Sequence, residues 1–308
     1  MSPAEMESLE RGEILTYSDE AYEFTQRQLS ADSMLKVNAS MDAIMKALQD
    51  DPTLIPNDVT TAHAVINSEA DFDGVEYGPD ELKEVDRLFE AKPGKDLNFS
   101  DSEYATLQKT LRPHLNASDA ERIKAASDAM RAVLIKRYND YRASGLKGIA
   151  RYARSKSKKV DVGAELQLTT DTLKPFEGDF PEFVRVMTGY PLGAGCCQHL
   201  FRWVKVRISK RPGFALSHTI IRTTDDYVIL AERVFYVSNQ LNSLQITTVW
   251  LPYEGGGHLG LAMTASADIL DSMVGRVLRK VGRNKARDIV ADVMKETKAD
   301  LESLDAAP

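Results

Sequence analysis

The sequence predicts an α+β protein in which an antiparallel sheet is closed by a long C-terminal helix and interrupted by a helical insertion. Three observations predict this fold. Residues 199–264 contain five successive strand patterns separated by short turns, and such strands are normally antiparallel neighbours. Residues 267–304 repeat apolar side chains with helical spacing. Residues 33–67 read as a strand, a helix and a second strand.

The five strands are expected at residues 201–208, 214–222, 226–238, 243–251 and 258–264. The helix after them spans roughly 35 residues, about 50 Å at the rise of an α-helix. A helix of that length most plausibly lies across the sheet. We expect it to present an apolar stripe to the strands: Ile269, Met273, Val277, Val281, Ile289, Val293 and Leu301, flanked by Leu270, Val274, Leu278, Val290 and Met294.

The N-terminal part starts with a short strand at 12–18 and a second at 33–38. Ser40 occupies the position of a helix N-cap before an amphipathic run. We expect that helix to end at Asp50-Asp51-Pro52, because proline disfavours helix in its predecessor. A further strand is predicted at 59–67.

Residues 68–189 are predicted to be a mostly helical insertion, acidic in its first part and basic in its second. Residues 1–67 and 190–308 then form the core of the fold. The best-marked helix begins with a capping box at Ser118 and Glu121 and ends at Gly145. Other helices are expected at 80–91, 102–112, 163–174 and 180–188, and residues 155–159 read as an exposed linker.

Charge divides the chain. Residues 1–120 carry 25 acidic and 10 basic side chains, a net −15, whereas residues 121–308 carry 21 and 29, a net +8. Such asymmetry is typical of two surfaces with different partners, although two solvated faces can also differ in this way. No apolar run approaches the ~18 residues of a membrane span. The N-terminus has no signal-peptide pattern, so a cytoplasmic location is expected as written, and a periplasmic one if Met1 replaces a removed signal peptide.

Few motifs with recognisable chemistry are present. The five histidines lack metal-ligand spacing, and no phosphate-binding or dinucleotide-binding motif occurs, so neither a metal nor a cofactor is expected. Cys196 and Cys197 are the only cysteines, and they leave the redox compartment open. A cysteine nucleophile with His199 as its base is one interpretation, and two small residues packed at the start of a strand is the other.

The segment Met34-Leu-Lys-Val-Asn-Ala-Ser-Met-Asp-Ala-Ile-Met-Lys-Ala-Leu-Gln-Asp50, with Pro56 beyond it, resembles the opening of the helix-grip superfamily, which includes START and Bet v1-like (SRPBCC) proteins. The antiparallel strands and the long terminal helix resemble the close of that fold. The whole chain also resembles a group of bacterial proteins of unassigned function. The stretches that carry this second resemblance are Leu9 to Ile14, Tyr138 to Tyr152 and Trp203 to His218.

The resemblance implies a cavity between the sheet and the C-terminal helix that binds a lipid-like ligand, without catalysis. A cyclase or hydratase using the same cavity, with His218 or a nearby acid, is the first alternative, and a protein or membrane interaction module is the second. Apolar cavities with few polar groups suit such ligands. The residues expected to contact the ligand are Phe214, Leu216, His218, Phe235, Trp250, Met263 and Met273.

Basic residues of the terminal helix suggest a contact with anionic membrane surfaces, and a solvated helix face is the competing interpretation. These are Arg276, Arg279, Lys280 and Arg283. A nucleic-acid partner is not expected, because the chain is acidic overall and its basic stretches lack interleaved aromatic residues. A histidine such as His218 is also common as a hydrogen-bonded core residue, which remains the competing interpretation of that position.

Overall fold

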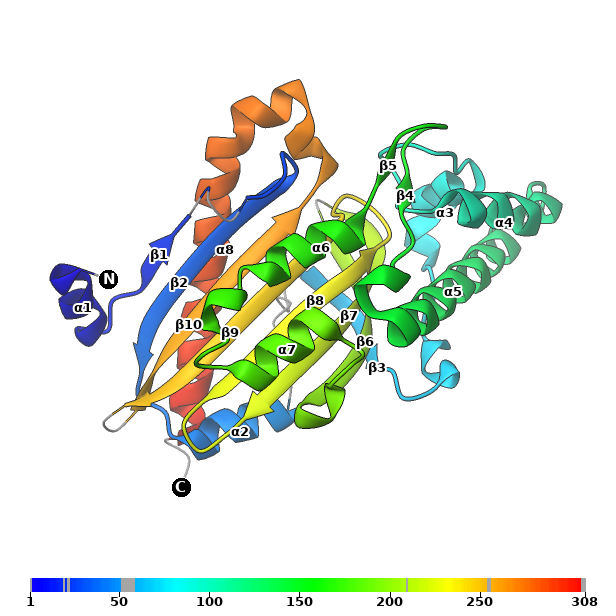
Figure 1. Ribbon diagram of the computed structural model, residues 1–308. Helices are drawn as coiled ribbons and strands as arrows, with labels where there is room; N and C mark the ends of the chain where they lie inside the picture. The colour runs from blue at the N-terminus through cyan, green and yellow to red at the C-terminus, as the bar shows by residue number, and fades with distance from the viewer. Residues whose placement is uncertain are drawn as a thin grey trace.

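A computed structural model of the protein describes residues 2–18, 20, 23–50, 59–208, 210–253 and 256–305. Eight strands form one antiparallel sheet in the order β1-β2-β10-β9-β8-β7-β6-β3 (Figure 1). The protein therefore has the predicted α+β class, with a large antiparallel sheet and a C-terminal helix. The strands are β1 (Leu15–Tyr17), β2 (Gln28–Val37), β3 (Thr60–Val65), β6 (Gln198–Ile208), β7 (Arg211–Thr223), β8 (Val228–Val237), β9 (Ser243–Tyr253) and β10 (Gly256–Ser266).

Helices cover both faces of this sheet (Figure 1). The inner face, defined here as the face that carries Leu35, Ile246 and Leu259, packs against α8 (Met273–Asp305) in a cluster that also includes α2 (Met41–Asp50). The outer face, which carries Phe214, Leu216 and His218, lies under the insertion. The insertion contains α3 (Leu82–Phe89), α4 (Asp101–Leu111), α5 (Asp119–Ser144), α6 (Val162–Asp171) and α7 (Pro181–Gly189).

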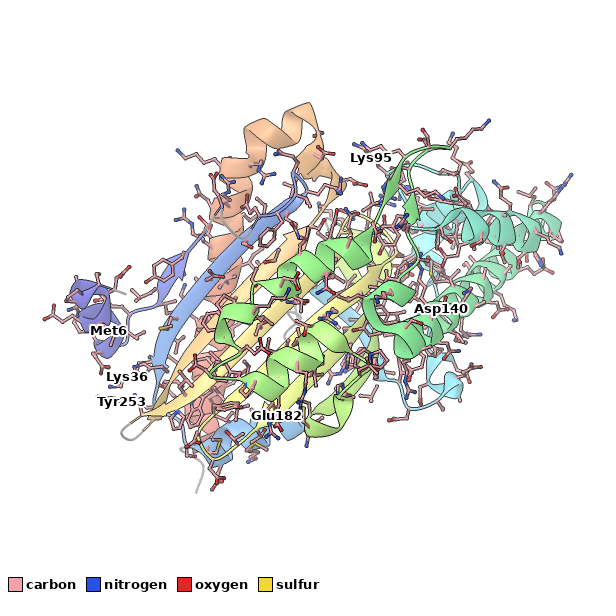
Figure 2. The ribbon with its side chains drawn as sticks, viewed as in Figure 1. Met6, Lys36, Lys95, Asp140, Glu182 and Tyr253 are labelled. Carbon is pink, nitrogen blue, oxygen red and sulfur yellow. The ribbon has the colours of Figure 1, made fainter. Side chains whose placement is uncertain are left out.

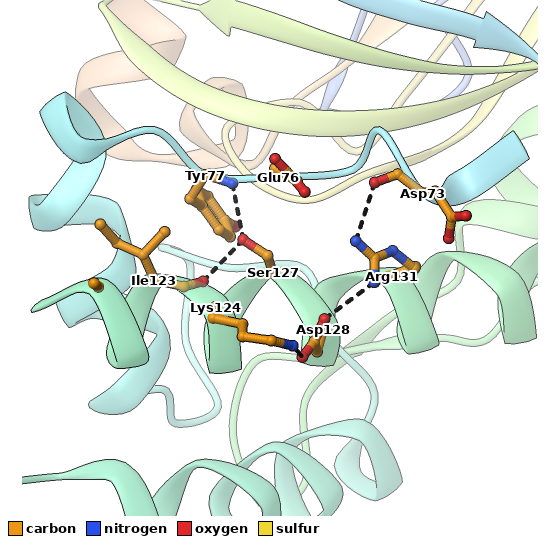
Figure 3. A pocket seen from close by; sticks show the side chains of 9 residues that line it. Asp73, Glu76, Tyr77, Ile123, Lys124, Ser127, Asp128 and Arg131 are labelled. Carbon is orange, nitrogen blue, oxygen red and sulfur yellow. Dashed lines mark hydrogen bonds and ion pairs between the residues drawn. The ribbon is translucent and has the colours of Figure 1, made fainter. Parts of the chain in front are cut away.

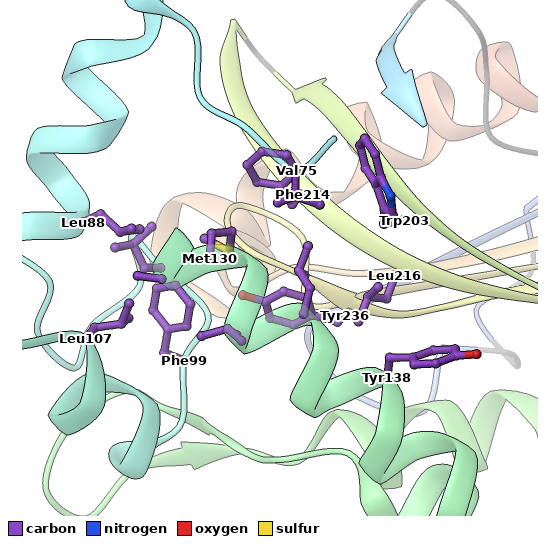
Figure 4. Packing of buried hydrophobic residues seen from close by; sticks show 14 of the residues in the cluster. Val75, Leu88, Phe99, Leu107, Met130, Tyr138, Trp203, Phe214, Leu216 and Tyr236 are labelled. Carbon is purple, nitrogen blue, oxygen red and sulfur yellow. The ribbon is translucent and has the colours of Figure 1, made fainter. Parts of the chain in front are cut away.

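The insertion shares a hydrophobic core with the outer face (Figure 4). Met130 of α5, Leu107 of α4 and Leu88 of α3 pack in one buried cluster with Phe214 and Tyr236 of the sheet. Burying apolar surface in this way stabilises a fold by about 25 cal/mol per Å². The segment predicted to be an insertion is thus part of the same packed body as the strands.

The N-terminal helix α1 (Pro3–Glu10), which the sequence analysis did not anticipate, lies at one end of the molecule with Met6 exposed on it (Figure 2). Lys95 and Asp140 of the insertion lie at the other end. A capping box between Ser2 and Glu5 starts α1. The short strand β1 that follows pairs with only part of β2.

Most predicted elements are present within a few residues of their expected bounds. The capping box at Ser118 and the glycine end at Gly145 (φ +58°) are confirmed for α5. The predicted linker at 155–159 is wrong in part, because Tyr152–Ala153 (β4) pairs with Lys159–Val160 (β5) in a small hairpin. The proposed helix end at Asp51-Pro52 lies outside the described residues.

The buried side of α8 coincides with the predicted apolar stripe only in part. Leu301 of the stripe and the flanking residues Val290 and Met294 are buried, whereas Val281 and Ile289 are 61% and 39% exposed. The helix approaches β2 closely, since a Cβ on Gly282 would lie 2.8 Å from a methyl carbon of Leu29. The helix thus turns its flanking residues toward the sheet along with part of the predicted stripe.

Candidate functional site

Polar side chains gather on the inner face of the sheet, where α8 and a hydrophobic core would lead one to expect apolar residues. Residues that pair directly across an antiparallel ladder point to the same face. Arg202 of β6 pairs with Ser217 of β7, and Thr219 of β7 pairs with Glu232 of β8. Thr248 of β9 lies on the same face, one step diagonally from Glu232. We call these five residues the inner polar group.

The inner polar group is buried. Glu232 and Thr219 are 0% exposed, and the other three members are at most 7% exposed. The hydroxyl oxygens of Ser217, Thr219 and Thr248 have no hydrogen-bond partner among the residues that the structure describes. A buried polar atom without a partner costs about 1–3 kcal/mol of stability. Three such atoms on one patch of the sheet lower the stability of the fold, and the packing of the protein gives no reason for this loss.

Apolar side chains surround this group on the same face. Val234 and Ile246 flank Glu232 along and across the strands, and Leu230 pairs with Thr248. Met263 and Trp250 continue the apolar surface toward β10. The indole Nε1 of Trp250 is itself buried without a partner among the described residues. The inner face thus offers a small polar centre within a wide apolar wall.

The outer face holds a second set of buried polar groups around Arg233, which is 0% exposed. Its guanidinium donates to the Tyr141 hydroxyl at 3.1 Å, to Thr170 Oγ1 at 2.9 Å and to the Met187 carbonyl at 2.9 Å. It also donates to Gln245 Oε1 at 3.4 Å. Thr170 and Met187 belong to the last turns of α6 and α7, where the helix dipoles favour a cation.

A chain of hydrogen bonds leads from Tyr141 to the surface. Tyr141 Oη lies 2.9 Å from His218 Nδ1, and His218 Nε2 lies 2.8 Å from His199 Nδ1. His199 Nε2 lies 2.9 Å from the Ala194 carbonyl. A carbonyl only accepts, so His199 Nε2 carries a hydrogen. If both rings are neutral, His218 Nε2–H donates to His199 and Tyr141 O–H donates to His218, and every group in the chain is satisfied.

The pKa values of both imidazoles fit the neutral form. Burial holds the pKa of His218 well below its usual value, and the positive charge of Arg233 adds to this effect. Burial also lowers the pKa of His199, although its bond to the Ala194 carbonyl opposes the shift. The pKa of Tyr141 is raised by burial, with Arg233 acting against the rise. The chain from Arg233 to Ala194 is consequently a fully paired core network.

The structure separates the residues that the sequence grouped as ligand contacts. Phe214, Leu216, His218 and Phe235 are buried in the outer-face cluster or its polar network, where Phe235 stacks on Tyr141 at 4.0 Å between ring centroids. Trp250 and Met263 lie on the inner face. The grouping of all six in one cavity beside α8 is therefore corrected. The seventh, Met273, starts α8, and its side chain lies outside the described residues.

The reason for this error is the two-residue period of strands, which shows that His218 shares a face with Phe214 and Leu216 but does not say which helices cover that face. The residues that the sequence analysis missed were Ser217, Thr219, Glu232 and Thr248. One signal was available: Glu232 and Arg233 are adjacent charges inside an apolar strand, so one of them has to point to each face.

The basic residues of α8 are largely neutralised within the protein. Arg279 and Arg283 both form ion pairs with Glu23, at 2.5 and 2.6 Å. Lys280 is exposed, and the side chain of Arg276 lies outside the described residues. Within the described part of α8, Lys280 is thus the member of the predicted membrane-contact group with the greatest exposure, and the membrane contact stays a prediction.

A cavity of about 470 Å³ lies on the insertion, between α5 and the segment 73–77 (Figure 3). Three of its charged side chains are engaged with their neighbours: Arg131 donates to the carbonyls of Phe72 and Asp73, and Asp128 pairs with both Arg131 and Lys124. Ser127 accepts from the Tyr77 backbone and donates to Ile123. This polar surface cleft is separate from the inner polar group.

Among the described residues, no group of three or more potential metal ligands is placed to hold an ion, and no helix is long and apolar enough to cross a membrane. No protein-family model matches the chain, and no curated protein or solved structure matches it either.

Proposed function

We propose that this protein has a helix-grip organisation and binds an amphipathic, mainly apolar ligand between the inner face of the sheet and α8. One observation carries the proposal: Ser217, Thr219 and Thr248 bury three hydroxyl groups that have no hydrogen-bond partner in the described part of the chain, at the polar centre of a mainly apolar face. The chain order also agrees with the resemblance, since a strand, helix α2, a strand, an antiparallel meander and a long closing helix follow one another.

The polar centre determines which hydrogen-bonding groups the ligand needs. Each of the three hydroxyl groups can both donate and accept a hydrogen bond, and Trp250 Nε1 can only donate. A ligand with a hydroxyl, carbonyl or ester group would pair with them and offset the free energy that their burial costs. The rest of the ligand would lie against the aliphatic wall of Leu230, Ile246 and Met263.

The same geometry changes which residue could act in the alternative function, an enzyme of the cyclase or hydratase type. His218 points into the outer-face network, so it does not reach a ligand on the inner face. Glu232 is the acid on the inner face, and it stands directly opposite Thr219 in the ladder. A cyclase or hydratase in this position would therefore depend on Glu232 and not on a histidine.

Native mass spectrometry of the purified full chain tests the proposal, followed by solvent extraction and identification of bound molecules. We expect an apolar molecule with one oxygen-containing group. Thr219→Val should reduce its occupancy or affinity about tenfold, the loss of roughly one good hydrogen bond. Thr106→Val on α4, whose threonine is exposed, is the matched control and should retain the wild-type occupancy. A protein that stays ligand-free after incubation with mixed lipid extract would contradict the proposal.

A further inference from the structure

A short loop connects α7 to β6 and contains the two cysteines of the chain. It runs through Gly193, whose φ of +75° is a left-handed conformation that favours glycine, to Cys197 at the start of β6. Cys196 and Cys197 are both free and half-buried, and their sulfur atoms lie 3.2 Å apart. Side chains of adjacent residues rarely turn toward each other in this way, because extended backbone sends them to opposite sides.

The loop is attached to the polar network of the outer face through one atom. The Ala194 carbonyl accepts hydrogen bonds from the Cys197 backbone N–H at 3.2 Å and from His199 Nε2–H at 2.9 Å. His199 in turn bonds to His218. A change of backbone conformation at Cys196 and Cys197 would therefore move the acceptor that fixes the hydrogen on His199.

We propose that Cys196 and Cys197 form a reversible redox modification site, in which a hydroperoxide oxidises the two neighbouring thiols to a disulfide. This site is independent of the ligand proposed for the inner face. It lies on the far side of the sheet from α8, beside Glu182 in α7, which Figure 2 labels.

The oxidation balances in two steps. The sulfur of Cys196 attacks one oxygen of the hydroperoxide and breaks the O–O bond, which gives a sulfenic acid at Cys196 and releases an alcohol, or water from hydrogen peroxide. The Cys197 sulfur then attacks the Cys196 sulfur, and the hydroxyl group leaves as water with the Cys197 proton. Two thiols lose two electrons in total, and the peroxide gains them.

The order of the two cysteines follows from their surroundings. Burial and the contact with Cys196 raise the pKa of Cys197 to about 12, so Cys197 is the poorer nucleophile toward the peroxide. It attacks only in the second step, where the sulfenic acid of Cys196 lies directly beside it. Cys196 follows Gly195, where a Cβ would meet nothing within 4 Å, so the backbone there has room to turn.

Closing the bond requires the sulfur atoms to approach by roughly 1 Å, from their contact to the length of about 2.05 Å of a disulfide. A ring between adjacent residues is strained, and strained disulfides are the readily reduced, regulatory ones. The peptide between the two cysteines has to rotate, and we expect the Ala194 carbonyl to leave His199. The oxidised protein would expose His199 Nε2–H to solvent.

The test treats the full chain with hydrogen peroxide and measures its intact mass without alkylation. We expect the loss of two hydrogens, restored by dithiothreitol, and NMR signals of the His199 ring that shift only in the oxidised form. Cys196→Ser should give neither change. Cys197→Ser should accumulate the sulfenic acid, one oxygen heavier, because it lacks the resolving thiol.

Two outcomes would overturn the inference. One is a wild-type chain that keeps two alkylatable thiols under conditions that oxidise a free cysteine peptide. The other is oxidation that produces only sulfinic acid or disulfides between chains, visible as added oxygen or as dimers on a non-reducing gel. A mass loss without any change at His199 would refute the coupling to the outer-face network.

Discussion

On the outer face of the sheet, the buried polar groups around Arg233 form hydrogen bonds with one another, whereas three buried hydroxyl groups on the inner face form none with the residues that the structure describes. Thr170 and Thr219 show the contrast at single residues. Both are 0% exposed, but Thr170 accepts from Arg233 and donates to Gln245, while Thr219 Oγ1 has no partner among the described residues.

This contrast indicates that buried polar groups have two different roles in the protein. A satisfied network on the outer face fixes the insertion onto the sheet, because its members come from α5, α6, α7 and four strands. The hydroxyl groups on the inner face that have no partner among the described residues cost stability, and the proposed ligand would supply their partners. The outer face has one similar group, because the Tyr236 hydroxyl also has no partner within the described part of the chain, but Arg137 stacks on that ring at 4.2 Å.

The largest effect is expected from Arg233→Met. The change leaves the Thr170 hydroxyl and the Met187 carbonyl with fewer donors in a buried site, and each lost partner costs about 1–3 kcal/mol. We expect the free energy of unfolding to fall by roughly 3–5 kcal/mol, measured by urea denaturation. Lys280→Met, at an exposed position, should change it by less than about 0.5 kcal/mol.

If Arg233→Met does not fold, Tyr141→Phe gives a milder measurement, since it removes only the hydroxyl between Arg233 and His218. A loss of about 1–3 kcal/mol is expected for that variant. Wild-type stability in Tyr141→Phe would show that the outer-face network does not hold the insertion in place.

The next effect compares the two buried threonines directly. Thr170→Val should lower the free energy of unfolding by about 1–3 kcal/mol, because it leaves Arg233 and Gln245 without their shared partner. Thr219→Val should leave the ligand-free protein unchanged or stabilise it by up to about 1 kcal/mol, because valine has the same shape and no unpaired atom. Equal destabilisation by both substitutions would remove the distinction between the faces.

How far the sequence predicted this molecule depends on the range of the interactions. Strand and helix periods are local, and so β6 to β10 and α5 were predicted within a few residues of their bounds. The hairpin of β4 and β5 was missed because strands of two residues carry no periodic pattern. The position of α8 relative to its apolar stripe was missed because it depends on contact between Gly282 and Leu29, which are distant in sequence.

The candidate site could not be predicted from local sequence patterns for a related reason. A strand alternates between two faces, and only tertiary packing decides which face meets α8 and which meets the insertion. The strand period places His218 on one face with Phe214 and Leu216 and so predicts a ligand contact, but its position between Tyr141 and His199 makes it part of the core network. Ser217 and Thr219 could not be recognised as site residues, because small hydroxyl residues are common in strands.

The smallest expected effect is the pH dependence of the free energy of unfolding, which arises from the histidines of the outer face. The titratable and charged groups that face His218 are Tyr141 and Arg142 from α5, Tyr190 after α7, Arg233 from β8, and His199 from β6. Because burial lowers the pKa of both imidazoles in the folded chain, the unfolded chain binds protons first as the pH falls through about 6.5. Stability is therefore fully present above that pH and decreases below it, by at most about 1.4 kcal/mol per pH unit for each histidine.

Urea unfolding between pH 7.5 and 5.5 measures this slope, and His218→Gln should make it shallower, because one of the two proton uptakes disappears. His114→Gln, in the short turn after α4, is the control and should keep the wild-type slope. Thr219→Val should also keep it, since no titratable member of the outer network touches the inner face. A slope unchanged in His218→Gln would mean that His218 is protonated in the folded protein, and the one-directional chain from Tyr141 to the Ala194 carbonyl would then be incorrect.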